Sequence, residues 1–555
     1  MKNTRSIVLA GLLAAALHAA PEQELKDAAG KTIIRYVVEA PDGLAPAGTA
    51  DPAKQVGLFI CSEEHDRPTA DEILPVRESL RRLGLSDQFV LLGIHPQQQK
   101  FGPMDHEPIR QIIAWARKTY PINPRRIYMY GKGEGAKISG EFGTTNPNLI
   151  TAAITYSWGW WMMPSELKKP IDPQVNGPEY YMILGLRDIP THLVTVRDTY
   201  TRMQAKGYHT IYREFEDLGP RTYHPTSNDD GIAWATRLRN KTIAPSAEET
   251  KLLQKPVLSN GSYPALALVG GSAAGAVVQK LLDSKDAAVR AAAAETCARA
   301  IFDEATLAVV AKKLSDPVYK VRRTAINALA INAQWRSAVS QQALITAALN
   351  QDSNADQTVR VAATDGLCQA VRLQLRSVRQ DPPVFKALIT LLTDKNEELR
   401  VMAANFLSPV RDAEFRGDIG RPEKKAPEGG WQKWLDEITA KNASYQKDYE
   451  VCASANSGGE QVDLFCKGRT ALVEQKDPAK AFQLTLKAAE LGYVPAQAMV
   501  GIMYANGKGV QQNYAEASNW LKKAADGKHP LAIVNSARSP KTYPEIPAGA
   551  FLTKQ

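Results

Sequence analysis

Short apolar runs alternate with longer amphipathic stretches between about residue 30 and residue 240. The runs are rich in β-branched residues, as buried strands are, and lie at 33–38, 56–61, 89–94, 127–130, 152–156, 180–184 and 210–215. The stretches between them, such as Glu72–Leu83 and Ile109–Tyr120, have helical spacing. Strands that alternate with helices predict a mostly parallel sheet with helices on both faces.

A second pattern occupies residues 244–425, which are rich in alanine and leucine with helical spacing. A short motif recurs there and ends in arginine each time, as in "DPVYKVR" and "DQTVR"; successive arginines, from Arg290 to Arg400, are 32, 38 and 40 residues apart. One helix pair cannot bury its apolar face alone, whereas stacked pairs can. The pattern therefore predicts an all-α solenoid of helix pairs.

The recurring motif resembles HEAT repeats. The resemblance implies that an aspartate near each turn and an arginine on each second helix pair between neighbouring repeats. The residues that match this ladder are Asp286, Arg290, Asp316, Arg322, Asp356, Arg360, Asp394 and Arg400. After the repeats, the polar segment "RPEKKAPEGG" predicts a linker, and Trp431 and Trp434 at helical spacing are expected to close the stack.

Two segments near the C-terminus repeat each other at an offset of 36 residues. "DPAKAFQLTLKAAE" begins at Asp477 and "NYAEASNWLKKAAD" begins at Asn513. These segments closely resemble Sel1-like repeats, which are related to tetratricopeptide repeats. Small residues would let the paired helices approach closely, namely Ala488, Ala489, Ala498 and Gly501, and Gly507 and Gly509 would permit a tight loop.

The N-terminus has the pattern of a secretory signal peptide. Lys2 and Arg5 precede an apolar core, Ile7–Leu17, and Ala19 and Ala20 offer a cleavage site. We expect export to the periplasm or beyond, and the apolar run is too short for a membrane span. The formal charge is +9, but Lys and Arg are spread along the chain. This distribution does not favour nucleic acid as a partner.

The chain has five cysteines, and their odd number leaves one outside any set of pairs. Cys297 and Cys368 lie on apolar faces of predicted helices, as core residues do. Cys452 and Cys466 flank the start of the last module and are the candidates for a disulfide in an oxidising compartment. No cysteine or histidine spacing predicts a metal site.

The stretch "YMYGKGEGAK", Tyr128 to Lys137, joins an apolar run to a helical pattern. Together with its surroundings, "YPINPRRIYMYGKGEGAKISGEFGTTNPNLITAAITYSW", it resembles the α/β-hydrolase fold, and within it esterases related to polyhydroxyalkanoate depolymerases and feruloyl esterases. Such enzymes have Gly-x-Ser-x-Gly here, because a sharp strand-to-helix turn presents the serine hydroxyl to a neighbouring histidine. This chain has Gly131, Gly133 and Gly135, so the nucleophile position is Gly133.

The resemblance places the other two members of a catalytic triad at Asp188 and His224, in the expected order. Glycine has no side chain that can attack, and loss of a nucleophile typically removes about six decades of rate. Ser139 lies nearly two turns further along the predicted helix and cannot replace Gly133 without remodelling, and Ser62 and Ser157 lack the elbow context. The segment after residue 61, "SEEHDRP", also departs from the His-Gly of the family. We therefore interpret the domain as a non-catalytic relative of hydrolases.

The glycines also match the dinucleotide fingerprint in spacing, with Ala136 as its third member. However, they follow a middle strand, and no acidic residue ends the next strand in "TYSWGWW". No Gly-Lys-Ser/Thr completes a phosphate-binding loop. We therefore expect no nucleotide and no other cofactor.

We expect a multidomain fold. A doubly wound α/β-hydrolase-like sheet is followed by an all-α solenoid and then by all-α helical-hairpin repeats. The expected parts are a signal peptide (1–20), the hydrolase-like domain (21–243), the HEAT solenoid (244–425), a linker with a capping helix (426–450), Sel1-like repeats (451–540) and a tail (541–555). The favoured function is an exported scaffold that binds other proteins through its repeats. One alternative is an esterase or depolymerase with an unrecognised nucleophile. Another is a binder of carbohydrate or a cell-envelope polymer, with the aromatic residues of Ser157–Trp161 lining a cleft.

Overall fold

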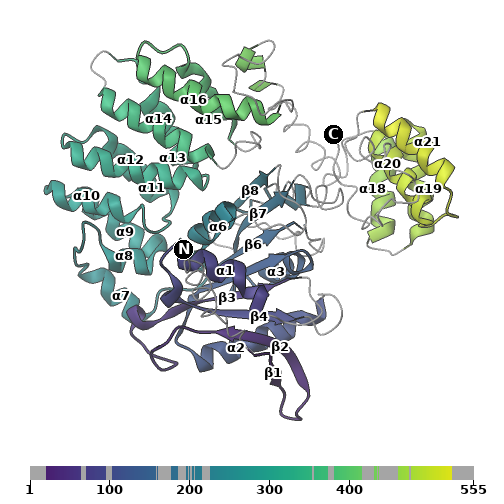
Figure 1. The fold of residues 1–555 in the computed structure, drawn as a ribbon, viewed down its shortest axis with the longest axis horizontal. Helices are drawn as coiled ribbons and strands as arrows, with labels where there is room; N and C mark the ends of the chain where they lie inside the picture. Colours follow the sequence, from purple (N-terminus) through teal and green to yellow (C-terminus); the bar gives the residue numbers. More distant parts are fainter. Residues whose placement is uncertain are drawn as a thin grey trace, which may run out of the picture.

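Figure 1 shows the fold of the protein in a computed structural model. The structure describes residues 21–63, 70–95, 103–157, 159, 177–185, 196–197, 199–200, 203–204, 207–215, 225–352, 356–372, 381–414, 430–433, 435–436, 460–473 and 477–527.

A single sheet forms the centre of the N-terminal domain. Its strands among the described residues are β1 (Gln23–Lys26), β2 (Thr32–Glu39), β3 (Val56–Ser62), β4 (Phe89–His95), β5 (Ile122–Lys132), β6 (Ala152–Tyr156), β7 (Glu179–Gly185) and β8 (Thr210–Phe215). Their order is β1-β2-β4-β3-β5-β6-β7-β8. The strands from β4 to β8 in this order are parallel, whereas β2 pairs antiparallel with both β1 and β4. The strand β1 was not expected from the sequence, because its residues alternate and only half bury.

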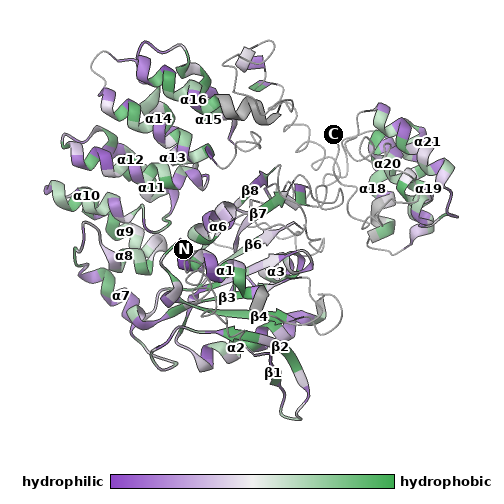
Figure 2. Ribbon diagram, in the orientation of Figure 1, coloured by the Kyte–Doolittle hydropathy of each residue, from purple (hydrophilic) through white to green (hydrophobic). Residues whose placement is uncertain are grey.

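Helices cover both faces of this sheet, as the alternating pattern predicts. The helices that the structure describes in this domain are α1 (Ala70–Arg82), α2 (His106–Thr119), α3 (Glu134–Thr145) and α6 (Pro225–Arg237). One face packs against α2 and α3, and the other packs against α1 and α6. Strands that are buried on both faces read as continuous apolar runs, which is why β4 is coloured as hydrophobic along most of its length in Figure 2.

A stack of helix pairs follows the sheet domain. Two short helices lead into it, α7 (Ala247–Gln254) and α8 (Pro264–Val269). The pairs are α9 (Gly271–Leu282) with α10 (Ala287–Thr296), α11 (Glu304–Lys312) with α12 (Tyr319–Gln334), α13 (Ala338–Ala348) with α14 (Gln357–Val371), and α15 (Pro382–Leu391) with α16 (Glu397–Glu414). The second helices pack on one another in one layer and the first helices in another. Four pairs stacked in this way are what the HEAT resemblance implies.

Buried contacts join the stack and the sheet domain at several places. Near the start of β5, Arg125 forms an ion pair of 3.3 Å with Glu249 of α7, and both side chains are almost fully buried. The turn after α12 inserts Trp335 into the same apolar cluster that holds α1 and α6 against the sheet. The two parts therefore share a core and do not meet only through a linker.

The far end of the stack is closed in part by the segment that follows it. Residues 430–433 and 435–436 are helical. Leu435 is buried in the core of the stack, and Trp431 packs against that core. Trp431 thus lies where a residue that closes the stack would lie, while Trp434 falls outside the described residues.

The C-terminal module consists of two helical hairpins. Its helices are α18 (Glu460–Val473), α19 (Pro478–Glu490), α20 (Val494–Asn506) and α21 (Tyr514–Asp526). A Cβ atom on Gly501 would lie 3.0 Å from the Ala517 carbonyl oxygen, so glycine lets α20 and α21 approach closely. Gly507 ends α20 in the left-handed region with φ of 63°, a conformation that favours glycine. Throughout the described part of the chain, no helix combines the length and the apolar character that crossing a membrane requires.

Candidate functional site

The turn from β5 into α3 is the candidate site of the sheet domain. Gly133 stands between them with φ of 56° and ψ of −129°. Its N–H donates to the Tyr156 carbonyl at the end of β6 (3.0 Å), and its own carbonyl accepts from the Ala136 N–H (2.9 Å). Position 133 is therefore a sharp turn at the carboxyl edge of the sheet, in a conformation that is strained for any residue with a side chain.

The two flanking glycines are required by close contacts. A Cβ atom on Gly131 would lie 2.1 Å from the Gly135 carbonyl oxygen. A Cβ atom on Gly135 would lie 1.9 Å from the Ser62 carbonyl oxygen. The Gly-x-Gly-x-Gly spacing thus combines two close approaches of the backbone with one turn of positive φ. This is a sharp strand-to-helix turn of the kind that a nucleophile elbow requires, and the residue at its centre is glycine.

Two serines near the elbow are structural in their contacts. Ser62 ends β3 and Ser139 lies on α3, and both are fully buried. Their Oγ atoms are 3.3 Å apart, and the Ser62 hydroxyl lies 3.1 Å from the Gly135 carbonyl oxygen. These contacts hold β3 and α3 together beneath the elbow.

Ser157 differs from these two serines. It directly follows β6, has φ of 65°, and its side chain is 1% exposed. Its hydroxyl has no hydrogen-bond partner within the described ranges. A strained residue with an unsatisfied buried hydroxyl, one position after the carbonyl that holds Gly133, is a site feature that the sequence did not reveal.

The predicted acid and base, Asp188 and His224, lie outside the described residues, so their meeting with Gly133 stays a prediction. The described residues nearest to them along the chain are Gly185, which ends β7, and Pro225, which begins α6. The segment "SEEHDRP" after Cys61 and the tryptophans of "SWGWW" also lie largely outside the described residues.

The helix α6 is held firmly on both sides. Arg82 of α1 forms an ion pair of 2.7 Å with Asp229. The next residue, Asp230, accepts a hydrogen bond from Tyr181 and one from the indole N–H of Trp335 at 3.2 Å. These contacts hold α6, which begins at Pro225, against α1, against β7 of the sheet and against the helical stack.

The structure brings most of the ladder residues together. Arg290 binds Asp316 through Nε and Nη2 at 2.7 and 3.0 Å. Arg322 lies 2.7 Å from Asp356, and Arg360 lies 2.5 Å from Asp394. Each arginine thus reaches the aspartate of the next repeat. The hydrogen bonds from Arg290 hold the pKa of Asp316 below its usual value.

The first aspartate of the ladder, Asp286, and its last arginine, Arg400, contact only their own turns among the described residues. Asp286 caps α10 by accepting from the Ala288 N–H (2.8 Å). Arg400 donates from Nη1 to the carbonyls of Asp394 and Lys395 in its own turn, at 2.8 and 3.0 Å. Neither residue forms an ion pair within the described parts of the chain.

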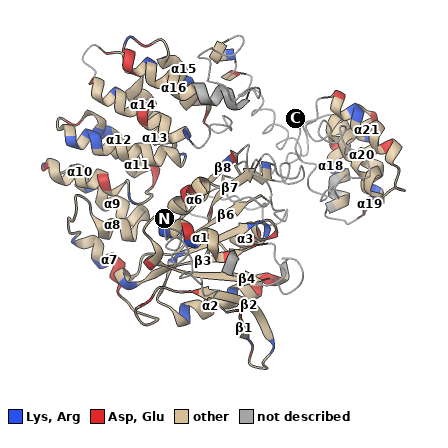
Figure 3. Ribbon diagram, viewed as in Figure 1, with Lys and Arg blue, Asp and Glu red and all other residues tan. Residues whose placement is uncertain are grey.

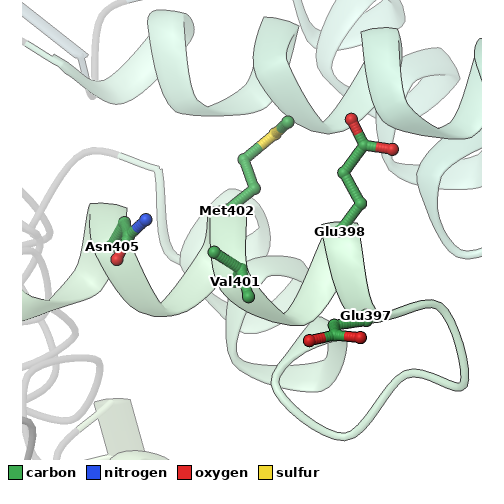
Figure 4. Close-up of a pocket in the computed structure, with 5 residues that line it drawn as sticks. All are labelled: Glu397, Glu398, Val401, Met402 and Asn405. Atoms are coloured by element: carbon green, nitrogen blue, oxygen red, sulfur yellow. The ribbon is translucent and has the colours of Figure 1, made fainter.

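Hollows lie on the described part of the helical stack, two of which are large. One, of about 1040 Å³, is lined by small apolar residues of α11 and α13, such as Ala311 and Ala343, and by charged residues that include Asp352. The other, of about 660 Å³, lies on α16 (Figure 4). Charged residues of both signs are interspersed over the helices and do not form one block (Figure 3).

The family model of the Sel1 repeat matches residues 459–493 and 494–529. These residues are Sel1 repeats. The match covers α18 with α19 and α20 with α21, so each repeat is one helical hairpin. No curated protein matches this chain.

Several solved structures of hydrolases resemble the sheet domain. A thermostable esterase is 18% identical, with 40% of this chain and 63% of that chain covered and a TM-score of 0.30. An S-formylglutathione hydrolase from Staphylococcus aureus is 11% identical, with 40% and 99% covered and a TM-score of 0.31. A ferulic acid esterase is 12% identical, with 39% and 97% covered and a TM-score of 0.31. The chain thus spans 63% of the length of the first of these structures.

The cysteines of the described residues lie in all three parts of the chain, with Cys61 buried in β3 of the sheet domain. Cys297 and Cys368 are buried in the stack, and burial raises the pKa of both thiols, to about 12 for Cys368. Cys466 lies on α18 in the first Sel1 repeat and is half-buried. Its predicted disulfide partner, Cys452, lies outside the described residues, so the pairing stays a prediction.

Proposed function

We propose that this protein is a non-catalytic binding protein, in which an α/β-hydrolase domain carries helical repeats that contact other proteins. The observation that carries this proposal is the glycine at the elbow. Position 133 has the sharp turn of a nucleophile elbow, yet it presents no hydroxyl or thiol. Acyl transfer by this fold needs a nucleophile at that position.

The repeats support the binding half of the proposal. Sel1 repeats generally mediate contacts between proteins, and they occupy residues 459–529. Stacked helix pairs likewise present extended surfaces of the kind that repeat proteins use for recognition. The two kinds of repeat together make up most of the chain after residue 264.

A second candidate function is supported by Ser157. Its positive φ, its unsatisfied hydroxyl and its place beside the elbow are features of a strained functional residue. In this alternative the protein is an ester hydrolase whose nucleophile has moved from the end of β5 to the end of β6. The burial of Ser157 argues against it, because a substrate must reach the attacking oxygen.

We predict that the purified protein neither hydrolyses short acyl esters nor reacts with a fluorophosphonate probe. The reason is that Gly133 lacks the attacking group, whose loss typically removes about six decades of rate. Mass mapping of the probe-treated protein checks this result. Labelling of Ser157 that disappears in Ser157→Ala, but persists in Ser139→Ala, would replace the proposal with the second candidate.

The substitution Gly133→Ser tests the inherited elbow from the other direction. Serine at this φ costs about 1–3 kcal/mol of strain. If the predicted triad survives, the new hydroxyl should gain weak ester turnover that His224→Ala abolishes in the same background. Turnover that is unaffected by His224→Ala would contradict the predicted role of His224.

We also propose that the chain is exported and that Cys452 and Cys466 form a disulfide at the entry to the Sel1 repeats. The signal-like N-terminus and the closeness of the two cysteines in sequence support this. On the chain-entropy model a loop of this size stabilises by about 3 kcal/mol. Envelope material that still begins at Met1, or two free thiols under non-reducing conditions, would reject the respective half.

A further inference from the structure

Among the described residues, the last arginine of the arginine–aspartate ladder has no acceptor beyond its own turn. Arg290 and Arg322 each hold their own turn through Nη1 and reach the next repeat through other guanidinium nitrogens. Arg400 holds its own turn in the same way, with Nη1 on the carbonyls of Asp394 and Lys395. Its Nε and Nη2 have no partner in the part of the chain that the structure describes. The guanidinium is thus oriented toward a carboxylate that no described residue supplies.

The surface beside Arg400 includes an exposed apolar side chain. Counting from the ladder arginines, Val401 of α16 corresponds to Val361 of α14, which is partly buried against the core of the stack, and to Arg323 of α12, which is exposed. Val401 itself is 50% exposed. A terminal repeat normally has a polar outer face. Figure 4 shows Val401 and Met402 on α16, beside the hollow of about 660 Å³.

One further contact defines what this surface accepts. Gln357, three residues before Arg360, accepts from Asn396 of the next repeat at 3.1 Å. Asn396 lies two residues after Asp394, the ladder acceptor. The residue at the matching position before Arg400 is Glu397, which lines the hollow. A carboxylate at that position accepts hydrogen bonds and favours a donor such as asparagine or lysine.

We propose that the α16 face, defined by Glu397, Arg400, Val401 and Met402, binds a helical hairpin of a partner protein. The turn of this hairpin carries an aspartate for Arg400 and, two residues later, an asparagine or lysine for Glu397. The inference rests on the proposed function and names the chemistry of one partner. The association repeats, between two chains, the packing that the stack already uses within one chain.

The other acidic turns of the chain match this surface less well. Asp286 is followed two residues later by Ala288, and the outer side of its repeat is already packed by α8. Asp477 begins the second helix of the first Sel1 hairpin, but Ala479 stands two residues after it. In both turns the residue two positions after the aspartate is alanine, whose side chain cannot donate a hydrogen bond to Glu397. A second copy of the chain and the Sel1 hairpin thus fit the α16 face less well than a partner hairpin, and the second experiment below distinguishes the three.

The first experiment measures binding of a synthetic peptide to the full-length protein by fluorescence anisotropy. The peptide copies residues 381–407, the hairpin that fills the corresponding face of α14. We expect Arg400→Glu to weaken its binding by about tenfold or more, because the charge pair becomes a repulsion. Arg323→Glu is the matched control: this residue is exposed on α12, and its reversal should leave binding unchanged. An Asp394→Lys peptide should regain affinity for the Arg400→Glu protein, and equal binding to all three proteins overturns the proposal.

The second experiment identifies the natural occupant. A photo-crosslinking residue, Val401→p-azidophenylalanine, is introduced into the full chain, and cross-linked segments are mapped in envelope extracts. A helical hairpin of another protein with the acidic turn supports the inference. A cross-link to residues 460–490 or to a second copy of the chain overturns the inference about the α16 face. The absence of any cross-link, in a protein that still captures partners, also overturns it. Each of these outcomes leaves the proposed function intact. A chain that captures no partner at all contradicts the proposed function itself.

Discussion

Replacement of Gly135 by alanine should unfold or severely destabilise the sheet domain. The added Cβ atom would lie 1.9 Å from the Ser62 carbonyl oxygen and 2.3 Å from its carbon. Both obstacles are backbone atoms of β3, which is paired with β4 on one side and β5 on the other. Relief would require α3 to move away from the sheet and expose Ile138 and Phe142, which are fully buried. We expect a loss of about 4 kcal/mol or more in the free energy of unfolding.

A matched control lies two turns further along the same helix. A Cβ atom on Gly143 would come no closer than 3.4 Å to any neighbour, the Tyr180 hydroxyl. Gly143→Ala should therefore be neutral or stabilise by up to about 1 kcal/mol, the helix preference of alanine over glycine. Urea unfolding followed by circular dichroism compares the two variants. If Gly135→Ala proves as stable as Gly143→Ala, the close approach at the elbow is not the reason for this glycine.

Removal of the Trp335 side chain should separate the unfolding of the stack from that of the sheet domain. Its ring is 95% buried, packs in the core beneath α6 and lies under the Arg237 guanidinium at 4.7 Å. Its indole N–H donates to Asp230, and its carbonyl oxygen lies 3.1 Å from His209 Nε2. Trp335→Ala leaves a cavity at the joint and should cost about 3–5 kcal/mol. In urea, we expect the sheet domain and the stack of this variant to unfold in two separate transitions. In the natural chain, the two parts should unfold together.

Trp335→Phe is the control for this variant. Phenylalanine keeps most of the buried ring surface and loses only the donor to Asp230, so a loss of about 1 kcal/mol is expected. Coupled unfolding of Trp335→Ala, within about 0.5 kcal/mol of the natural chain, would mean that the two parts are held together elsewhere. The buried pair between Arg125 and Glu249 would then be the next contact to test.

This joint decides how binding should be mapped. A fragment that begins at residue 244 keeps Glu249 and Trp335 but loses Arg125 and the sheet against which Trp335 packs. Such a fragment would expose an unpaired charge and an aromatic side chain that the whole chain buries. Point substitutions in the full chain, such as Arg400→Glu, therefore test the repeats more cleanly than truncation does.

The apolar patterns were sufficient for most of the architecture. The runs at residues 56–61 and 89–94 became β3 and β4 almost unchanged, because strands buried on both faces need continuous apolar residues. The 36-residue offset between Asp477 and Asn513 became two hairpins, because each repeat must bury the same face. The short strand β1 was missed, since an edge strand that is only half-buried carries little apolar signal.

The candidate site was predicted only in part. The sequence by itself determined that position 133 cannot carry a nucleophile, because that follows from the chemistry of glycine alone. It also determined the recurring arginines, because a repeated motif is visible without coordinates. Which aspartate each arginine binds was decided by the stacking: the partner lies in the next repeat, 26 residues away for Arg290 and 34 for Arg360.

Only the tertiary structure revealed the strain at Ser157, the joint at Trp335 and the unfilled rung at Arg400. Backbone dihedral angles depend on the contacts of the whole sheet, so no local sequence pattern predicts a positive φ at a serine. Trp335 ends a helix whose sequence gives no sign that another domain receives it. Arg400 has the same sequence context as the arginines before it. What distinguishes it is that no described residue supplies its acceptor, and an unmet contact of that kind can be seen only in three dimensions.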